Sequence, residues 1–283
     1  MRDISQKKLN KILKKHELWL KGEGGEQANL RYANLGNAIL SYADLRHVDL
    51  SYSNLLRADL RGANLSCTDL RRANLRRANL EYTDLRHADL RGANLSCTDL
   101  THADLGNAKS TYTNLEDANL VCADLEHADL TNANLKYVNL RRANLTYTNL
   151  SDTNLVCADL RYANLKDIKT NINTTGYKLA CPEKGSFIGY KKAGGCIIEL
   201  LILEDAKRSS ATSSKCRTNK VKVLDIENIK TRNKVKEINS DYDNNFIYRV
   251  GEIVYVDNFN EYRWEECTSG IHFFMNKEDA INY

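Results

Sequence analysis

The sequence predicts a mainly β protein: a four-sided coil of stacked short strands, with a helix before it and a small α+β domain after it. Three observations predict the coil. Every fifth residue from Leu30 to Leu165 is leucine, in 27 of 28 positions, with Ser110 as the exception. The residue two before each position is small, most often alanine, and the residue between is Asn or Asp in 26 of 28 cases. A period of five fits neither a helix nor a flat strand.

Each group of five contains one alternating inward pair, such as Ala58 and Leu60, followed by two outward residues that we expect to vary freely. A chain that turns after every group would place all of these Ala and Leu side chains inside. Four sides would close a coil of about 20 residues, so the groups from Ala28 to Asp167 predict about seven coils and a height of about 34 Å. We expect the Asn and Asp side chains to bond backbone groups at the turns.

This pattern, as in Ala58-Asp59-Leu60-Arg61-Gly62, resembles the pentapeptide-repeat family, whose repeat is written A(D/N)LXX. The resemblance covers about half of the chain and implies a right-handed, quadrilateral β-solenoid. The quinolone-resistance members of that family are strongly acidic rods that mimic DNA. Because residues 27–168 carry 16 Lys and Arg against 17 Asp and Glu, we do not expect DNA mimicry here.

An amphipathic helix is predicted from Ile4 to Leu20, within a capping segment of residues 1–26. Asp3 and Gln6 predict a capping box at its start. A solenoid exposes unpaired edges at its ends, so we expect this helix to cover one of them. Its other face is rich in lysine, which would suit a membrane surface but is more simply a solvated face. The apolar stripe consists of Leu9, Ile12, Leu13, Trp19 and Leu20.

The composition excludes several protein classes. The 283 residues have a net charge of +4, which by itself does not imply nucleic-acid binding. The longest apolar runs, such as Leu200 to Leu203, fall far short of the ~20 residues of a membrane span. Met1 to Lys15 lacks the apolar stretch of a secretory signal. We therefore expect a cytoplasmic protein, in the host cytoplasm if the chain is viral, with reduced cysteines.

A second domain is predicted for residues 169–283, because all five Phe lie after Ile168. Lys207 to Arg217 is predicted to be a polar, basic connection and Thr231 to Asn245 a long loop, while Asn276 to Asn282 predicts a short terminal helix with Asn276 as its cap. The predicted strands are Ser186 to Lys191, Cys196 to Leu203, Lys220 to Ile226, Phe246 to Val250, Glu252 to Val256 and Ile271 to Phe274.

This second domain resembles a domain of unknown function that follows pentapeptide repeats in phage, large-virus and bacterial proteins. The resemblance implies no known activity. The residues that carry it are Phe187 to Lys191, Ala206 to Ser210, Lys215 to Arg217, Glu266-Cys267 and Gly270 to Phe274.

The end of the sequence is similar to one enzyme family. Gly270 to Phe274 (GIHFF), followed by Ala280 to Tyr283 (AINY), is similar to the strand-then-helix segment of ADP-ribosyltransferases, written GIYFA with a later SANY. The resemblance implies that His272 replaces the Tyr that stacks on nicotinamide. The family's catalytic Glu lies on a later strand, which the 283 residues do not include. We therefore expect at most a degenerate transferase, and otherwise a buried strand with a hydrogen-bonded His272.

Cysteine chemistry is weakly indicated. Four cysteines occupy the last, outward position of a repeat, and their spacing predicts neither a disulfide nor a metal cluster. In the second domain Cys181, Cys196, Cys216 and Cys267 could join His272 around zinc, but no CxxC spacing supports this. Cys216 or Cys267 with His272 as its base is a weaker possibility, because no third group is indicated. We expect no metal, no cofactor and no catalytic residue.

Two surfaces are candidates for binding. On the coil, arginine and tyrosine lie together on two neighbouring sides, and Arg and Tyr suit phosphates, bases and protein interfaces. The adjacent repeat positions are Asn on the side of Arg57 and Arg77, whereas on the other side Asp49, Asp69 and Asp89 partly neutralise the charge. We call this surface the arginine patch, and it consists of Arg57, Arg71, Arg72, Arg76, Arg77 and Tyr52. The second candidate is a ligand site in the C-terminal domain consisting of Lys207, Arg208, Ser209, Ser210, Lys215, Arg217 and His272.

The sequence therefore predicts a non-enzymatic scaffold, in which the solenoid faces and the C-terminal domain bind a macromolecular partner. An unknown protein is the expected partner. Two alternatives stay open: the C-terminal domain binds or modifies a nucleotide-like ligand, or the arginine patch binds nucleic acid. Membrane binding is not expected, and the sequence does not indicate an oligomeric state.

Overall fold

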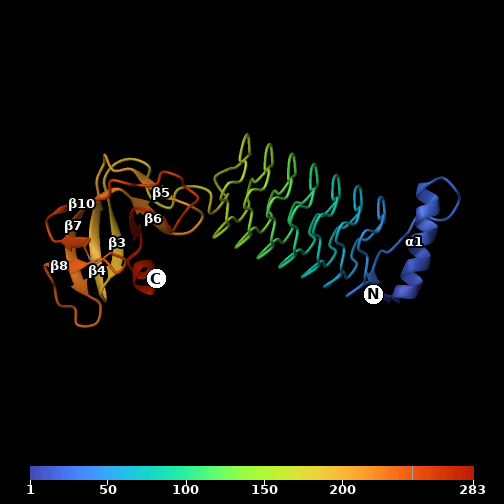
Figure 1. The fold of residues 1–283 in the computed structure, drawn as a ribbon, viewed down its shortest axis with the longest axis horizontal. Helices are drawn as coiled ribbons and strands as arrows, with labels where there is room; N and C mark the ends of the chain where they lie inside the picture. The colour runs from blue at the N-terminus through green and yellow to red at the C-terminus, as the bar shows by residue number, and fades with distance from the viewer. Residues whose placement is uncertain (244) are drawn as a thin grey trace. The chain divides into compact units, whose positions relative to one another are not determined.

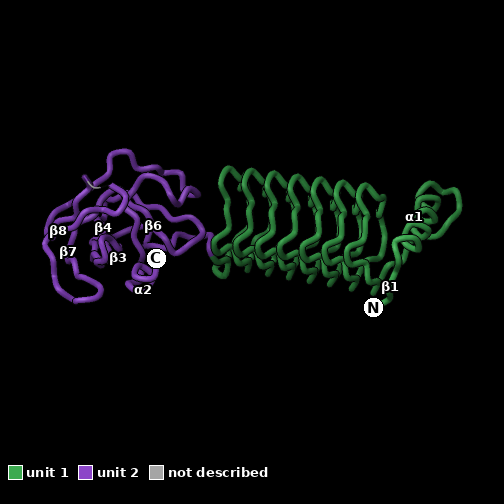
Figure 2. Tube along the Cα trace, turned by 60° about the horizontal axis from the view of Figure 1, so that its bottom comes forward, with its two compact units in different colours: residues 1–175 green, residues 176–283 purple. Residues whose placement is uncertain are grey.

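The computed structural model describes residues 1–243 and 245–283, which form two compact units, Met1–Thr175 and Gly176–Tyr283 (Figure 2). Asn244, in the predicted loop from Thr231 to Asn245, lies outside the described residues. Within the described part of the chain, no helix is long and apolar enough to cross a membrane.

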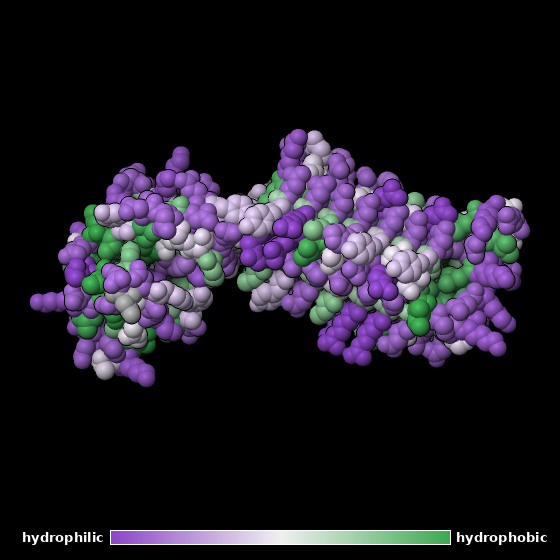
Figure 3. All heavy atoms as spheres, viewed as in Figure 1, coloured by the Kyte–Doolittle hydropathy of each residue, from purple (hydrophilic) through white to green (hydrophobic). Residues whose placement is uncertain are grey.

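The first unit is a stack of coils joined by parallel bridges between residues 20 apart, beginning with Asn29 and Asp49 (Figure 1). The bridges recur at every fifth residue, so each turn of the chain is bridged at four positions. Nearly all of the inward Leu and Ala side chains are buried, as the five-residue pattern predicts. Ser110, the exception among the leucines, is also buried, and its hydroxyl has no hydrogen-bond partner among the described residues. Outward side chains make the visible side of the coil largely hydrophilic (Figure 3).

Each corner of the coil is a tight turn closed by one backbone hydrogen bond, such as Ala78 N to the Leu75 carbonyl (2.9 Å). The second corner residue has a φ between 54° and 68° at every corner from Tyr32 to Asp167. A positive φ at this place is the mark of a type II turn. Only Gly62 and Gly92 are glycine there, and none of the others is β-branched. The expectation of two freely varying outward positions is therefore wrong for the second, because β-branched side chains clash in the left-handed region.

The Asn or Asp of each repeat stabilises the corner that follows it. Asn29 Oδ1 accepts a hydrogen bond from the Arg31 amide (3.1 Å), two residues later, and the same bond recurs along the coil. This is the side-chain-to-backbone bond that the sequence predicts at the turns.

The N-terminal segment covers the first coil. Strand β1 (Arg2–Asp3) pairs in parallel with β2 (Ala33–Asn34), and helix α1 (Gln6–Leu20) follows. The predicted capping box is wrong: Ser5 is the N-cap. Asp3 and Gln6 instead bond the coil, and the Gln6 amide pairs with both the N–H and the carbonyl of Ile39 (3.0 and 2.8 Å).

A buried histidine completes this cover. His16 is fully buried, and burial lowers its pKa, so the ring is neutral. Its Nδ1 accepts from the Ala28 amide (3.2 Å), which leaves Nε2–H to donate to the Arg46 carbonyl (3.0 Å). The side chain thereby satisfies two backbone groups that the end of a coil would leave unpaired.

The second unit is one antiparallel sheet of seven strands in the order β10-β7-β4-β3-β11-β6-β5, with a separate pair β8-β9. Its main core contains Phe273, Tyr248 and Ile198, and helix α2 packs on the other side through Ala280. The strands are β3 (Phe187–Ala193), β4 (Cys196–Ile202), β5 (Arg208–Ser210), β6 (Lys215–Thr218), β7 (Lys220–Asn228), β8 (Glu237–Asn239), β9 (Ile247–Arg249), β10 (Ile253–Tyr255) and β11 (Ile271–Phe274), and the helix is α2 (Lys277–Asn282).

Strands β3, β4, β7, β9, β10 and β11 coincide with predicted segments, and Asn276 caps α2 as predicted. The prediction of a polar connection at Lys207 to Arg217 is wrong, because β5 and β6 lie there as an edge pair of the sheet. Most of their polar side chains are buried, and Arg208, Arg217 and Thr218 donate to backbone carbonyls there. Strand β8 likewise interrupts the predicted long loop.

Candidate functional site

The arginine patch lies on two successive corners of the first unit. Tyr52 stacks on Tyr32 with ring centroids 5.0 Å apart, and the guanidinium groups of Arg31 and Arg72 lie 5.5 and 5.8 Å from the Tyr52 ring. Both contacts are within cation–π range. The corner therefore presents a continuous Arg-Tyr column.

The arginines of the patch differ in their partners. Arg71 is paired with Asp69, to which its Nη2 and Nε donate at 2.5 and 2.9 Å. No acidic partner is present among the described residues for the other four, Arg57, Arg72, Arg76 and Arg77, and all four are exposed. The free positive charge of the patch thus resides on these four.

An uncharged ladder separates the two corners. Asn54 Nδ2 donates to Asn34 Oδ1 (2.9 Å), and Asn74 Nδ2 donates to Asn54 Oδ1 (3.1 Å). The ladder places amide groups, and no carboxylate, between Arg72 on one corner and Arg76 on the next. The surface is accordingly suited to an anionic partner.

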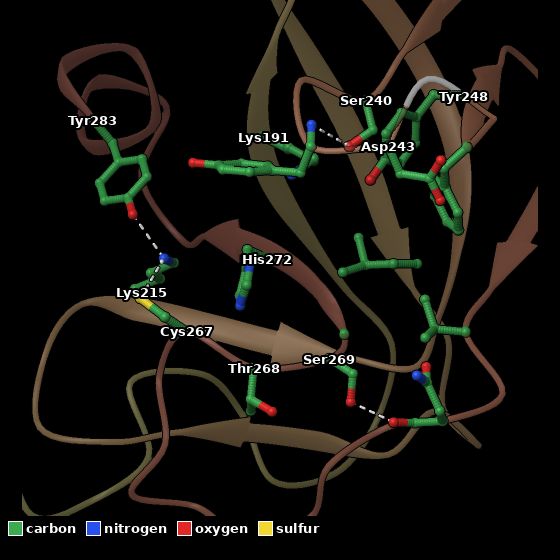
Figure 4. Close-up of a pocket in the computed structure, with 16 residues that line it drawn as sticks. Lys191, Lys215, Ser240, Asp243, Tyr248, Cys267, Thr268, Ser269, His272 and Tyr283 are labelled. Atoms are coloured by element: carbon green, nitrogen blue, oxygen red, sulfur yellow. Dashed lines mark hydrogen bonds between the residues drawn. The ribbon is translucent and has the colours of Figure 1, made fainter.

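The second unit contains a cavity of about 430 Å³ beside strand β11. Strand β11 pairs with β6 at four positions but with β3 only at Phe274 and Tyr190. The cavity lies where β3 and β11 separate, and its wall is completed by the segment before β9, by Tyr248 of β9 and by the segments after β10 and before β11 (Figure 4). The lining side chains include Lys191, Lys215, Tyr242, Tyr248, Cys267, His272 and Tyr283.

Lys191 is the most unusual of these side chains. It points from β3 toward the cavity and is only 7% exposed. Its Nζ lies 5.8 Å from the centre of the Tyr248 ring, and it has no hydrogen bond or ion pair among the described residues. Burial, with a contribution from the charge of Lys215, lowers the pKa of Lys191 to about 8. An ammonium in such a place is costly unless an anion joins it.

Lys215 reaches the cavity from β6. Its Nζ donates to the Tyr283 hydroxyl (2.7 Å) and approaches the Cys267 sulfur at 3.7 Å (Figure 4). Burial acts to lower the pKa of Lys215, but these two partners outweigh burial and raise it. Lys215 is therefore a fixed positive charge at neutral pH.

His272 adds no charge. Burial, and then the charges of Lys215 and Lys191, lower its pKa to about 4. The neutral ring donates from Nε2 to the Glu266 carbonyl (2.9 Å). Nδ1 is thereby left as an acceptor.

Only two of the seven predicted ligand residues, Lys215 and His272, line this cavity. Arg208 donates to several backbone carbonyls, among them Leu203 (2.8 Å), and fully buried Arg217 donates to Asn260 (2.8 Å). These two arginines hold loops in place by hydrogen bonds to backbone carbonyls. Lys207 pairs with Glu261, the Ser209 hydroxyl is buried, and Ser210 accepts from the Ala180 amide.

Sequence reasoning missed Lys191, although a signal was present. In β3 the alternation places Lys191 in phase with Gly189 and Ala193, both buried. A charged residue on the buried phase of a strand marks a special environment.

Thiol chemistry finds little geometric support. Cys216 is fully buried, and its contact with Cys181, together with burial, raises its pKa. Cys267 lines the cavity with His272, but its polar neighbour is Lys215. Within residues 1–243 and 245–283, no cluster of three or more His, Cys, Asp or Glu side chains could hold a metal.

Comparison with known proteins agrees with this architecture. Residues 28–66, 68–107, 98–136, 111–146 and 133–169 match pentapeptide repeats, and residues 177–280 match a family of unknown function, DUF5758. No curated protein matches the chain.

Three solved structures are similar to the repeat region. HetL from the cyanobacterium Nostoc, a pentapeptide repeat protein involved in heterocyst differentiation regulation, is 32% identical over 51% of this chain and 76% of its own, with a TM-score of 0.36. A pentapeptide repeat protein from the Arabidopsis thaliana thylakoid lumen is 30% identical over 38% and 71%, with a TM-score of 0.29. QnrB1, a plasmid-mediated fluoroquinolone resistance protein, is 20% identical over 52% and 85%, with a TM-score of 0.32.

The repeat matches and the leucine-lined β coil lead to the same conclusion: the chain belongs to the pentapeptide repeat proteins, and its repeats precede a domain of the unknown-function family.

Proposed function

We propose that this protein is a non-enzymatic interaction scaffold whose repeat unit binds an acidic macromolecular partner on the arginine patch. The observation that carries the proposal is the set of four exposed arginines without an acidic partner among the described residues, beside a ladder of uncharged Asn. Elsewhere on the coil, Arg46, Arg86, Arg91 and Arg161 each pair with the Asp two residues before them. Arg61 and Arg142 are also exposed without an ion pair among the described residues, but the patch gathers four such arginines on two neighbouring corners.

The coil suits a scaffold because its core is set by the leucine ladder and not by the outward residues. Side chains at equivalent corners of successive coils stand about 4.8 Å apart, a spacing fixed by the backbone. A partner meets a backbone whose spacing is already fixed, so binding has to order only the exposed side chains. An acidic protein surface is the partner class we favour, because Tyr52 and the arginines are side chains that dominate protein interfaces.

The test compares two variants of equal charge change. Arg72, Arg76 and Arg77 become Ala in the first, and the paired arginines Arg46, Arg86 and Arg161 become Ala in the second. The intact protein is crosslinked in a cell extract, and the crosslinked peptides are identified by mass spectrometry. We expect the unmodified protein and the second variant to crosslink to the same acidic segments, and the first variant to lose them. Equal crosslinking by all three proteins would refute the proposal.

Nucleic acid is the second candidate for the same patch, and the Arg-Tyr column favours it because bases stack on aromatic rings. In this case a labelled oligonucleotide should bind at low salt, and the logarithm of its affinity should fall linearly with the logarithm of the salt concentration. The three Ala substitutions in the patch should reduce that slope. Equal affinity of both variants for the oligonucleotide would exclude nucleic acid as the partner of the patch.

Finer features of the molecule belong to the same proposal. We infer a right-handed winding in about seven coils, a capping segment of residues 1–26, a solenoid of residues 27–168 and a cytoplasmic location.

A further inference from the structure

We propose that the cavity of the second unit binds a small organic anion, whose carboxylate or phosphate group is held by the amino groups of Lys191 and Lys215. This binding site is independent of the arginine patch and of the scaffold role.

The buried ammonium group of Lys191 lacks a compensating partner among the described residues. The side chain is more than nine-tenths buried and lines the cavity without a hydrogen bond or an ion pair among the described residues. With a pKa of about 8 it is still mostly protonated at pH 7. Buried charges in folded proteins are paired or bind an ion. The cavity is the open side from which such a counter-ion can reach Lys191.

The nearby carboxylates accept hydrogen bonds from backbone amides. Asp241 accepts from the Gly194 amide (2.7 Å), and Asp243 accepts from the Asn245 amide (2.9 Å). Neither forms an ion pair with Lys191 or Lys215 in the described part of the chain. His272 is neutral. Asp241 lines an adjoining hollow with both lysines and its charge acts on Lys191, but no carboxylate of the described residues forms an ion pair with either ammonium group.

The size and lining of the cavity suit an organic anion. A volume of about 430 Å³ lies within the range of small-molecule pockets and is far larger than an inorganic ion needs. Tyr242, Phe246, Tyr248 and Tyr283 supply aromatic surface for an apolar or planar body. Lysine recognises carboxylate and phosphate alike, because its ammonium acts as a point charge without the planar geometry of arginine.

The experiment uses the full chain and four probes: benzoate, phenyl phosphate, inorganic phosphate and the neutral benzamide. Binding is measured at pH 7 by calorimetry and by ligand-observed NMR. The variants are Lys191→Met, Lys191→Gln and Lys215→Met. The matched control is Lys236→Met, which removes one exposed lysine of the same unit that lies outside the cavity. Thermal melting first establishes that each variant is folded. Two substitutions are made at Lys191 so that the test still stands if one of these variants does not fold.

We expect benzoate or phenyl phosphate to bind with a Kd of about 1 mM or lower, and benzamide to bind at least about tenfold more weakly. Each substitution at Lys191 or Lys215 should weaken binding of the anion by at least about tenfold, while Lys236→Met should leave the affinity unchanged. The tighter of the two aromatic anions identifies the head group, and weaker binding of inorganic phosphate shows that the organic body contributes. The proposal is overturned if neither aromatic anion binds at about 10 mM, if benzamide binds equally well, or if folded Lys191 variants bind as the unmodified protein does.

Discussion

Replacing Lys191 with methionine should stabilise the second unit at neutral pH, even though it removes the proposed ligand contact. Methionine has nearly the same length as lysine and fills the same space without a charge. The folded unit holds the Lys191 ammonium in a buried place that lowers its pKa from 10.5 to about 8. The unfolded chain hydrates the same group fully. The charge therefore costs stability only in the folded state.

The pKa difference sets the size of the effect. At about 1.4 kcal/mol for each pKa unit, the shift from 10.5 to about 8 corresponds to about 3 kcal/mol of unfolding free energy. The sign follows from the protons bound. Between pH 8 and 10.5 the unfolded chain holds a proton that the folded unit has lost, so the stability of the unmodified protein rises with pH across this window. The gain in unfolding free energy of Lys191→Met over the unmodified protein is thus largest below about pH 8, and it falls by about 3 kcal/mol by pH 10.5.

The groups that face Lys191 contribute little to the pH dependence of this difference in unfolding free energy. Asp241 acts against the shift and Lys215 adds to it, and the raised pKa of Lys215 keeps that ammonium charged through most of the window. His272 is neutral throughout. Burial raises the pKa of Tyr248 above its usual value, which keeps that side chain neutral as well.

The assay is urea denaturation followed by the fluorescence of Trp264, in a Trp19→Phe background so that only the second unit is observed. The midpoint and slope are measured at several pH values from 7 to 10.5 for unmodified, Lys191→Met and Lys236→Met proteins. Lys236 is exposed, so its replacement should change the unfolding free energy by only a few tenths of a kcal/mol at every pH. A difference between the Lys191→Met and unmodified proteins that stays constant with pH would refute the reasoning.

Three further predictions concern other buried or strained residues. The His272 ring, with a pKa of about 4, should show no NMR titration between pH 8 and 5, and a midpoint near 6.5 would contradict its burial. His16→Leu should destabilise the first unit by about 1 to 3 kcal/mol in thermal or urea unfolding, because two backbone groups lose their partner; an unchanged midpoint would show that water replaces the ring. Cys97→Val, at a corner with φ of 56°, should cost about 1 to 2 kcal/mol more than Ser96→Val next to it, and equal costs would mean that the corner relaxes.

The repeat unit could be predicted almost completely because its information is local and repeated. Each buried leucine recurs at a fixed spacing, so the inside of the coil follows from geometry alone. The cap was predicted as a helix, but its contacts were not. Gln6 bonds Ile39, 33 residues away, and no spacing in the sequence indicates such a pair.

The second unit was predicted less well because polar residues are buried there. Lys207 to Arg217 reads as a solvated connection, yet Ser210 and Arg217 are buried and bond backbone groups of distant segments. The cavity depends on the point where β3 and β11 separate, which follows from sheet order and not from composition. Lys191 was the one member whose strand phase carried a detectable signal.

The corners connect the fold of the repeat unit to its proposed binding surface. Tyr52, Arg57, Arg72 and Arg77 all occupy the second corner position, with φ between 55° and 58°. At these positions the backbone excludes β-branched residues and tolerates side chains without a branch at Cβ, such as those of arginine and tyrosine. Alanine has no branch at Cβ and so avoids this clash, although it too must adopt a positive φ at the corner. Replacing these arginines with alanine therefore changes the charge of the surface while leaving the backbone strain nearly as it was. A loss of binding in those variants would then report on the side chains themselves and not on an unfolded coil.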